Sequence, residues 1–347
     1  MPELRKDPII GRWVIVATER SKRPSDLTRG SLTDQGIGLS AKPIKKCPFC
    51  EGNEAFTPPE VYALRKEGTG ANKPGWDIRV IPSISPFLRM EGELDRHGAG
   101  MYDLMNGIGA HEIIVATPKH EAGTFLNDVS QIEKLTGVII KRMRELSKDT
   151  RLKYVLIFKN HGKVAGGSNF RHEHVQLIAT PATPKRVKEE LTGSKRYFDY
   201  KDRCVFCDML RQELDRDERV VAEQDGFIAI NPYCSRFPFE TWILPKKHSC
   251  DFHKMTKDDI KGFSGIFHTT IKKLTGTLGD FPYNIVLHTA PFRSRKEKGY
   301  WETIEQDFHW HLEIMPRLTQ VAGFEWGSGF YINPTKPEDA CKYLKGA

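Results

Sequence analysis

The fold is decided by the stretch His-Glu-His-Val-Gln at residues 172–176. A second His-x-His pair, within His-Trp-His-Leu-Glu, occupies residues 309–313 in the other half of the chain. In each half a Cys-x-x-Cys pair and a lone histidine after an apolar run come before the His-x-His pair, in the same order. The cysteine pairs lie at residues 47–50 and 204–207, and the lone histidines are His120 and His248. This repeated order predicts a duplicated fold. The paired histidines predict that imidazole groups take part in the chemistry of the protein.

The paired histidines are interpreted as parts of strands. Side chains alternate between the two faces of a strand, so His172, His174 and Gln176 project from one face. One histidine can then bind a metal while its neighbour faces a substrate. A neutral imidazole is a competent nucleophile at phosphorus, and the Gln176 amide can donate to a phosphate oxygen. The alternative is a core pair or two metal ligands, but the glycine-rich segment at residues 160–169 favours a phosphate site.

The cysteine pairs predict metal centres. Two thiolates supply half of a tetrahedral zinc site, and the two pairs are too distant in the sequence for a simple zinc ribbon. Each pair would therefore recruit histidines from its own half. The candidate ligands are Cys47, Cys50, His120 and His172 in the first half, and Cys204, Cys207, His248 and His309 in the second. Small buried thiols with surface histidines are the alternative, which the repetition disfavours, so we expect one zinc ion in each half.

The composition limits the class of protein and its partners. Of the 347 residues 39% are hydrophobic and 28% are charged, which is typical of a globular protein. The net charge of +8 favours a polyanionic or phosphate-bearing partner, either nucleic acid or a nucleotide sugar. No stretch approaches the roughly 20 apolar residues of a membrane span, and the N-terminus lacks the apolar core of a secretory signal. Four of the seven cysteines lie in close pairs, which favours thiolate ligands over disulfides. We therefore expect a cytoplasmic protein without a membrane segment.

The apolar pattern predicts an α+β fold in which one antiparallel unit is used twice. Residues 126–148 and 258–278 show helical spacing, which gives one long helix per half. The predicted strands lie at residues 111–116, 154–158, 172–179, 226–230, 240–244, 284–288 and 309–315. A further strand at residues 79–82, ending in Pro82, is expected at a sheet edge. The polar, basic segment at residues 181–201 is interpreted as the junction between domains at residues 1–185 and 186–347.

With these residues assembled, the chain resembles the galactose-1-phosphate uridylyltransferase family of the histidine-triad superfamily. That family has a related branch that acts as an ADP-glucose phosphorylase. The resemblance spans about residues 8–317 and rests on separated motifs, at residues 11–16, 20–24, 172–176 and 239–248. It implies a cytoplasmic homodimer of carbohydrate metabolism, in particular galactose metabolism, that binds a nucleotide sugar and a sugar phosphate.

The resemblance also implies roles for single residues. His174 would form a nucleotidyl-histidine intermediate, Gln176 would hold the transferred phosphoryl group, and the first cysteine and histidine set would bind zinc. The implied substrate-binding residues are Arg20 and Arg23 at the nucleotide phosphates, Asn160 with Ser168 or Asn169 in the glycine-rich segment, and Gly323, Phe324 and Glu325 at the sugar. One departure from the family signature is Glu173, which replaces the proline between the paired histidines.

Alternatives remain for the second metal and for the reaction. Some members of the family bind a metal through histidines matching His288, His309 and His311 together with a glutamate. We prefer the cysteine set because it repeats the first site. The expected function is transfer of a nucleoside monophosphate between a nucleotide sugar and a hexose 1-phosphate, as in a UDP-glucose–hexose-1-phosphate uridylyltransferase. An ADP-glucose phosphorylase, with phosphate as acceptor, is the alternative enzyme, and a zinc-stabilised nucleic-acid-binding protein is the alternative of another class.

Overall fold

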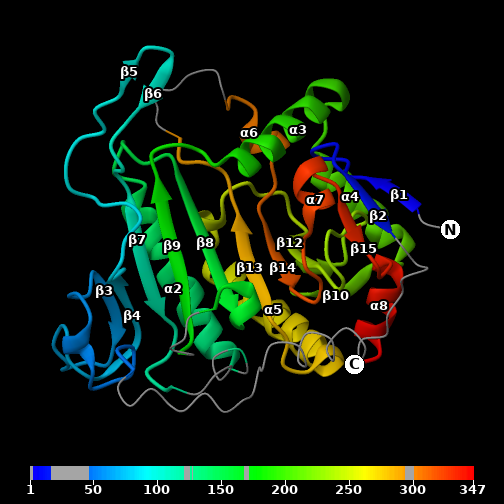
Figure 1. Cartoon of the computed structure of the whole chain (residues 1–347). Coiled ribbons are helices and arrows are strands. Elements are labelled where there is room, and N and C mark those ends of the chain that lie inside the picture. The colour runs from blue at the N-terminus through cyan, green and yellow to red at the C-terminus, as the bar shows by residue number, and fades with distance from the viewer. Residues whose placement is uncertain (1–2, 17–46, 121–125, 127, 168–171, 294–300) are drawn as a thin grey trace.

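A single sheet of ten strands runs through both halves of the chain (Figure 1). The computed structural model describes residues 3–16, 47–120, 126, 128–167, 172–293 and 301–347. The strand order is β10-β11-β12-β14-β13-β8-β9-β7-β4-β3, and all neighbours in this sheet are antiparallel. Its strands are β3 (Tyr62–Arg65), β4 (Trp76–Pro82), β7 (Ala110–Val115), β8 (Tyr154–His161), β9 (His174–Thr180), β10 (Val220–Gln224), β11 (Phe227–Ile230), β12 (Thr241–Pro245), β13 (Tyr283–His288) and β14 (His311–Pro316).

The sheet is built from two equivalent halves. The first contributes the order β3-β4-β7-β9-β8, and the second contributes β10-β11-β12-β14-β13, so that corresponding strands follow in the same order from each edge. One long helix follows the third strand of each half, α2 (Val129–Leu146) after β7 and α5 (Lys257–Leu278) after β12. The halves join where β8 pairs with β13. The predicted duplicated, antiparallel α+β fold is confirmed.

Each long helix has an apolar stripe that is buried against the sheet and an N-terminal cap that satisfies free backbone N–H groups. In α2 the buried residues recur at helical spacing, and the Asp128 side chain accepts hydrogen bonds from the backbone of Ser130 and Gln131. In α5 a capping box joins Thr256 and Asp259. The stripes of α2 and α5 share one core with sheet residues such as Val175. These helices therefore cover one face of the sheet, and the alternate side chains of β9 project from the opposite face.

Helices and a smaller sheet complete the fold around this framework. The segment predicted as a junction forms α3 (Lys185–Lys201), which is followed by α4 (Val205–Arg216). In the tail, α7 (Gly323–Ser328), β15 (Tyr331–Asn333) and α8 (Pro337–Lys345) return to the N-terminus, where β15 pairs in parallel with β2 (Trp13–Val16). In this small sheet β2 also pairs with β1 (Glu3–Lys6). A separate hairpin of β5 (His97–Ala99) and β6 (Tyr102–Leu104) projects from the body in Figure 1. The division between residues 185 and 186 stays a prediction.

The expectation of an edge strand at residues 79–82 was wrong. These residues end β4, which lies inside the sheet between β3 and β7. An interior strand can accommodate Pro82 because it is the last residue of β4, so its missing N–H costs no hydrogen bond in the middle of the strand.

Candidate active site and metal centres

His174 opens β9 on the sheet face that α2 and α5 leave open. Its Nδ1–H donates to the carbonyl oxygen of His172 over 2.7 Å. A carbonyl oxygen only accepts, so Nδ1 carries the proton and the neutral ring keeps its lone pair at Nε2. Burial lowers the pKa of His174, which holds the ring neutral near pH 7. The lone pair at Nε2 is therefore the reactive position of this imidazole.

Gln176 follows on the same face of β9. Its Oε1 lies 3.1 Å from Nε2 of His111, which projects from the neighbouring strand β7. The carbonyl end of the amide is thus occupied, and the NH₂ end remains to donate. His111 was not among the predicted site residues, because the pairing of β7 with β9 is a tertiary feature that the residue pattern does not contain.

The first predicted ligand set is brought together at one place. One ligand atom from each of the four residues lies within 4.8 Å of the others. Nε2 of His172 donates to the carbonyl oxygen of Thr117 over 2.7 Å, which turns Nδ1 to within 3.6 Å of both thiols. A second hydrogen bond that fixes the ring in this way is typical of metal-binding histidines. The residues of this group are Cys47, Cys50, His120 and His172.

The chemistry of this group fits a zinc ion. Burial and the adjacent Cys47 thiol raise the pKa of Cys50 to about 11, so the two sulfurs resist ionising together. A bound dication removes that penalty, because zinc holds thiolates and neutral imidazoles in a tetrahedral site. Nδ1 of His120, at 3.3 Å from the Cys50 sulfur, supplies the fourth donor.

The second predicted set forms an equivalent group in the other half. Nε2 of His309 donates to the carbonyl oxygen of Pro245 over 2.9 Å, and Nε2 of His248 donates to that of Glu305 over 3.1 Å. Both rings therefore direct Nδ1 at the Cys207 sulfur, at 3.6 and 3.3 Å. The group consists of Cys204, Cys207, His248 and His309, again with ligand atoms within 4.8 Å of one another.

A third group of possible ligands lies beside the second. It consists of Glu190, His288, His311 and Glu313. His309 belongs to the cysteine group alone, so the two alternatives for a second metal do not compete for this ring. Glu313 already has a partner outside this group, since the Arg236 guanidinium lies 2.6 Å from its carboxylate, whereas Glu190 contacts Nδ1 of His288 within the group at 2.7 Å. Glu190 was not predicted as a ligand, because α3 and β14 meet only in the folded chain. Glu313 was not predicted either, although it shares a strand face with His311 and strand alternation could have identified it.

Glu173, the departure from the family signature, has a structural partner. Its side chain is buried and forms an ion pair with the buried ammonium group of Lys159 on β8. Because strand side chains alternate, Glu173 points away from the face that carries His174. The substitution therefore places charge on the helix-covered side of the sheet and leaves the face that carries His174 unchanged.

The other predicted substrate residues differ in where the structure puts them. Asn160 lies on β8, where its Oδ1 accepts from Asn284 over 2.8 Å, and Asn284 also holds the carbonyl of Ala165 in the glycine-rich segment. Gly323, Phe324 and Glu325 begin α7, and within the described chain the hydrogen bonds of Glu325 stay in the tail, to the backbone of Ala322 and Ile332. Arg20, Arg23, Ser168 and Asn169 lie outside the described residues.

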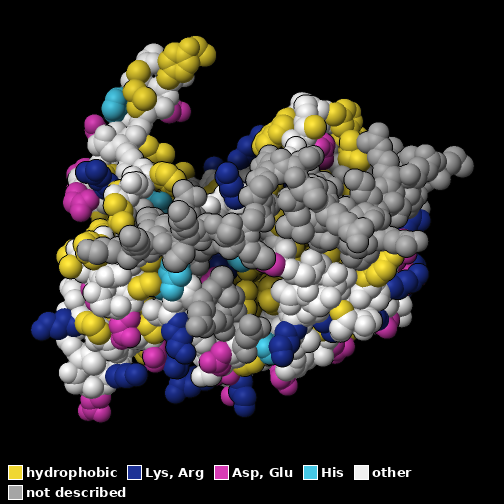
Figure 2. Space-filling view, turned by 60° about the horizontal axis from the view of Figure 1, so that its bottom comes forward, with side chains coloured by type: hydrophobic (Ala, Val, Ile, Leu, Met, Phe, Trp, Pro, Cys, Tyr) yellow, Lys and Arg dark blue, Asp and Glu magenta, His cyan; other side chains and the backbone are white. Residues whose placement is uncertain are grey.

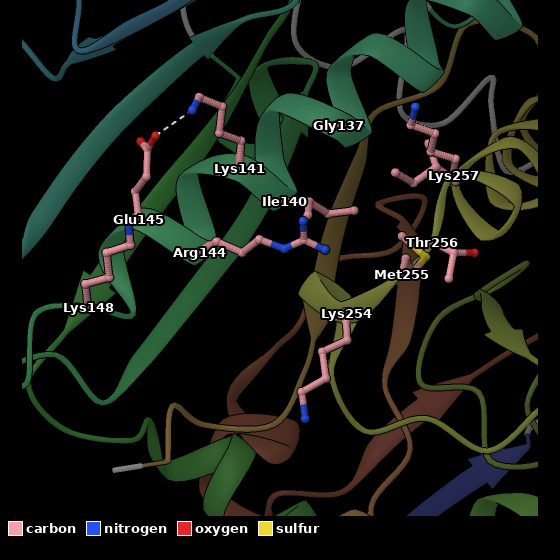
Figure 3. Close-up of a pocket in the computed structure, with 11 residues that line it drawn as sticks. Gly137, Ile140, Lys141, Arg144, Glu145, Lys148, Lys254, Met255, Thr256 and Lys257 are labelled. Atoms are coloured by element: carbon pink, nitrogen blue, oxygen red, sulfur yellow. Dashed lines mark ion pairs between the residues drawn. The ribbon is translucent and has the colours of Figure 1, made fainter. Parts of the chain in front are cut away.

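A basic groove lies elsewhere on the molecule. It has a volume of about 710 Å³ and is lined from α2 and the start of α5, with Lys141, Arg144, Lys148, Lys254 and Lys257 around it (Figure 3). Lys141 is paired with Glu145. Since α2 and α5 cover the sheet face opposite to His174, the groove is not part of the candidate active site.

The surface charge is mixed. On the face shown in Figure 2, the Lys and Arg side chains are scattered among Asp and Glu side chains and form no continuous stripe in the described part of that face. A stripe or patch of basic residues is the usual footprint of nucleic-acid binding. No helix in the described part of the chain is long and apolar enough to cross a membrane.

The duplicated antiparallel fold, with His174 beside a cysteine–histidine group, is that of a nucleotidyltransferase of the histidine-triad class. Residues 190–338 match the C-terminal domain of galactose-1-phosphate uridyl transferase, and residues 110–182 match the N-terminal domain of a family of unknown function, DUF4931. ADP-glucose phosphorylase of Arabidopsis thaliana is 33% identical over 99% of this chain and 92% of its own. The chain therefore belongs to the galactose-1-phosphate uridylyltransferase family, which includes ADP-glucose phosphorylase, and it is an enzyme.

Further relatives support this membership. Galactose-1-phosphate uridylyltransferase of Thermotoga maritima is 29% identical over 99% of this chain and 98% of its own. Among solved structures, the Arabidopsis thaliana ADP-glucose phosphorylase with bound ADP-glucose superposes with a TM-score of 0.81 at 31% identity, covering 100% of this chain and 99% of that one. A uridylyltransferase structure superposes with a TM-score of 0.73 at 23% identity, covering 100% and 98%, and shares the fold.

Proposed function

We propose that the enzyme transfers a nucleoside monophosphate from a nucleotide sugar to a hexose 1-phosphate through a covalent intermediate on His174. The observation that carries this proposal is the hydrogen bond from Nδ1 of His174 to the His172 carbonyl, because it leaves the Nε2 lone pair available. Gln176, on the same strand face, would donate its amide hydrogens to the phosphoryl oxygens.

The reaction would take place in two displacements. In the first, Nε2 of His174 forms a bond to the α-phosphorus, and the bond from that phosphorus to the bridging oxygen breaks, releasing the sugar 1-phosphate. In the second, a phosphate oxygen of the acceptor attacks the same phosphorus and His174 leaves with its lone pair. A covalent intermediate divides one difficult transfer into two easier ones. The amide of Gln176 would stabilise the charge that develops on the phosphoryl oxygens in both steps.

Zinc has a supporting role in this proposal. Cys47, Cys50, His120 and His172 would hold one ion, and Cys204, Cys207, His248 and His309 would hold a second. With four protein ligands each, both sites would be structural, since catalytic zinc keeps an open position. The first ion would fix His172, whose carbonyl in turn orients His174. A homodimer in the cytoplasm, acting in galactose metabolism, completes the proposal by analogy with the family.

The acceptor has a second candidate. The Arabidopsis thaliana relative, at 33% identity, is an ADP-glucose phosphorylase, and its solved structure holds ADP-glucose. With the same histidine, inorganic phosphate in place of hexose 1-phosphate would make this chain such a phosphorylase.

One experiment tests the mechanism and separates these candidates. The protein is incubated with UDP-glucose or with ADP-glucose, each labelled at the α-phosphate, and denatured to trap any covalent label. Galactose 1-phosphate or inorganic phosphate is then added to labelled protein, and the labelled product is identified. Label that appears from one nucleotide sugar and is discharged by one acceptor identifies the reaction. If the wild-type protein takes no label from either nucleotide sugar, the double displacement is wrong.

A further inference from the structure

The orientation of the Gln176 amide is fixed from a neighbouring strand. His111 on β7 is buried and lies across the ladder from β9, with its Nε2 3.1 Å from Oε1 of Gln176. On its other side, Nδ1 of His111 accepts a hydrogen bond from the backbone N–H of Phe87 over 3.3 Å. The three groups form one chain of hydrogen bonds, from a backbone amide through an imidazole to a side-chain amide.

The direction of this chain follows from its first member. The Phe87 backbone N–H can only donate, so Nδ1 of His111 must be the unprotonated nitrogen. A neutral imidazole carries its single proton on the other nitrogen, and His111 therefore donates from Nε2. Oε1 of Gln176 is the acceptor, and the NH₂ group of Gln176 is turned away from His111.

The aromatic ring of Phe87 adds a second restraint on His111. The two rings stack with centroids 4.8 Å apart and an angle of 29° between their planes. The side chain of Phe87 is 75% exposed, whereas His111 is 6% exposed. His111 is therefore held by a backbone donor at one edge and by a ring on its face.

We propose that His111 is a positioning residue that keeps the NH₂ end of Gln176 directed at the transferred phosphoryl group; this rests on the proposed function. The two ends of a glutamine amide are nearly equal in size, so packing alone selects neither. If the amide turned over, its oxygen would face the phosphoryl oxygens and repel the charge that develops on them. A donor that is oriented before the reaction stabilises that charge without reorganisation.

The test uses two variants of almost equal shape. His111→Gln retains an amide donor at this place, while His111→Met is similar in length and has none. We expect His111→Met to lower kcat by about 10- to 100-fold, since a small misplacement of a group at the reacting centre has that order of effect. KM for the nucleotide sugar should change much less, and His111→Gln should recover most of kcat. Zinc content and melting temperature show which variants are folded, and His111→Phe replaces His111→Met if the latter is not.

The same substitutions in a Gln176→Ala background show whether His111 acts through Gln176. If it does, His111→Met should cost less than about threefold once Gln176 is gone, because coupled residues are not additive. An equal loss in both backgrounds, or a His111→Met enzyme as fast as the wild type, would overturn the proposal. The assay first requires nucleotidyl labelling of the wild-type protein; its absence would refute the proposed function itself, and with it the role given to His111.

Discussion

Nδ1 of His174 lies 2.7 Å from the carbonyl oxygen of His172, so the proposed nucleophile is oriented by a residue whose own ring faces the first cysteine pair. The His172 ring is oriented in turn by the carbonyl of Thr117 at 2.7 Å. A displacement of the first cysteine pair would therefore shift His172 and, through its carbonyl oxygen, the orientation of the His174 ring. In the second half the same contact recurs between Nδ1 of His311 and the carbonyl of His309, at 3.2 Å. There, however, His311 is fully buried, whereas His174 is partly exposed.

The first prediction concerns His174 itself. His174→Ala should lose nucleotidyl labelling and at least about 10³-fold in kcat, because removing a nucleophile leaves only substrate binding and charge stabilisation. Zinc content and melting temperature should stay at wild-type values, since the ring makes no contact with the thiols of the metal groups that the structure describes. Labelling is measured by mass spectrometry of the intact protein. A labelled His174→Ala protein would exclude His174 as the nucleophile.

The second prediction separates the two zinc sites. Metal analysis of the wild-type protein should give about two zinc ions per chain, one for each four-ligand group. Cys47→Ser and Cys207→Ser should each lose one ion and melt at a lower temperature, because metal binding is coupled to folding. Cys47→Ser should also lose labelling, since its site holds His172 and thereby His174.

Cys207→Ser is the matched control for this experiment. It removes one thiol from the equivalent group in the other half, where His311, two residues after His309, is buried. It should retain much more labelling than Cys47→Ser, measured at a temperature where both variants are folded. A wild-type protein that contains no zinc when purified without chelators would contradict both sites.

The cysteine and histidine sets could be predicted from sequence because duplication doubles the signal. Each set draws on short local motifs, and the order of the motifs is the same in both halves, so the grouping did not require knowledge of the strand register. The long helices could be predicted equally well, since their apolar stripes and caps are local sequence features. The role proposed for His111 could not be predicted from the sequence, because it depends on the pairing of β7 with β9.

Long-range contacts explain the other differences between sequence and structure. The sequence shows Glu173 in place of a proline but does not show its ion-pair partner, because Lys159 lies on a neighbouring strand. The segment at residues 79–82 looked like an edge because of Pro82, but the chain adds β3 outside it. Glu190 joins a histidine group because α3, expected to be a polar junction, packs as a helix against that part of the fold.

The third prediction decides between the two alternatives for the second metal. His288→Ala should leave the zinc content at about two ions per chain, because the second ion is assigned to the cysteine group. The Glu313 carboxylate near His288 is already engaged by the guanidinium of Arg236, which is not one of the possible ligands. The zinc contents of His288→Ala and Cys207→Ser are measured in parallel. Loss of an ion from His288→Ala with none lost from Cys207→Ser would favour the group that contains His288 and His311.

The fourth prediction concerns stability in acid. Asp251 is buried, and burial alone would raise the pKa of its carboxyl group, but hydrogen bonds from Arg293 and Lys254 outweigh burial and lower the pKa to about 2. The closest contacts are 2.5 Å to Arg293 and 2.7 Å to Lys254. In the unfolded chain the carboxyl has an ordinary pKa near 3.8. The ionised form therefore stabilises the folded state above pH 3.8, by about 2 kcal/mol, and this contribution is lost as the pH falls from 3.8 to 2.

Asp251→Asn should accordingly lower the free energy of unfolding at pH 7 by about 2 kcal/mol, and the difference from the wild type should shrink below pH 3.8. Urea unfolding at several pH values measures it, at a fixed zinc concentration because metal loss also destabilises the protein in acid. Asp215→Asn, at an exposed carboxylate on α4, is the control and should change the free energy of unfolding by less than about 0.5 kcal/mol. The Asp251 carboxyl can be titrated directly by NMR. A midpoint near 3.8, or equal stability of wild type and Asp251→Asn at pH 7, would show that the ion pairs with Arg293 and Lys254 contribute no net stabilisation.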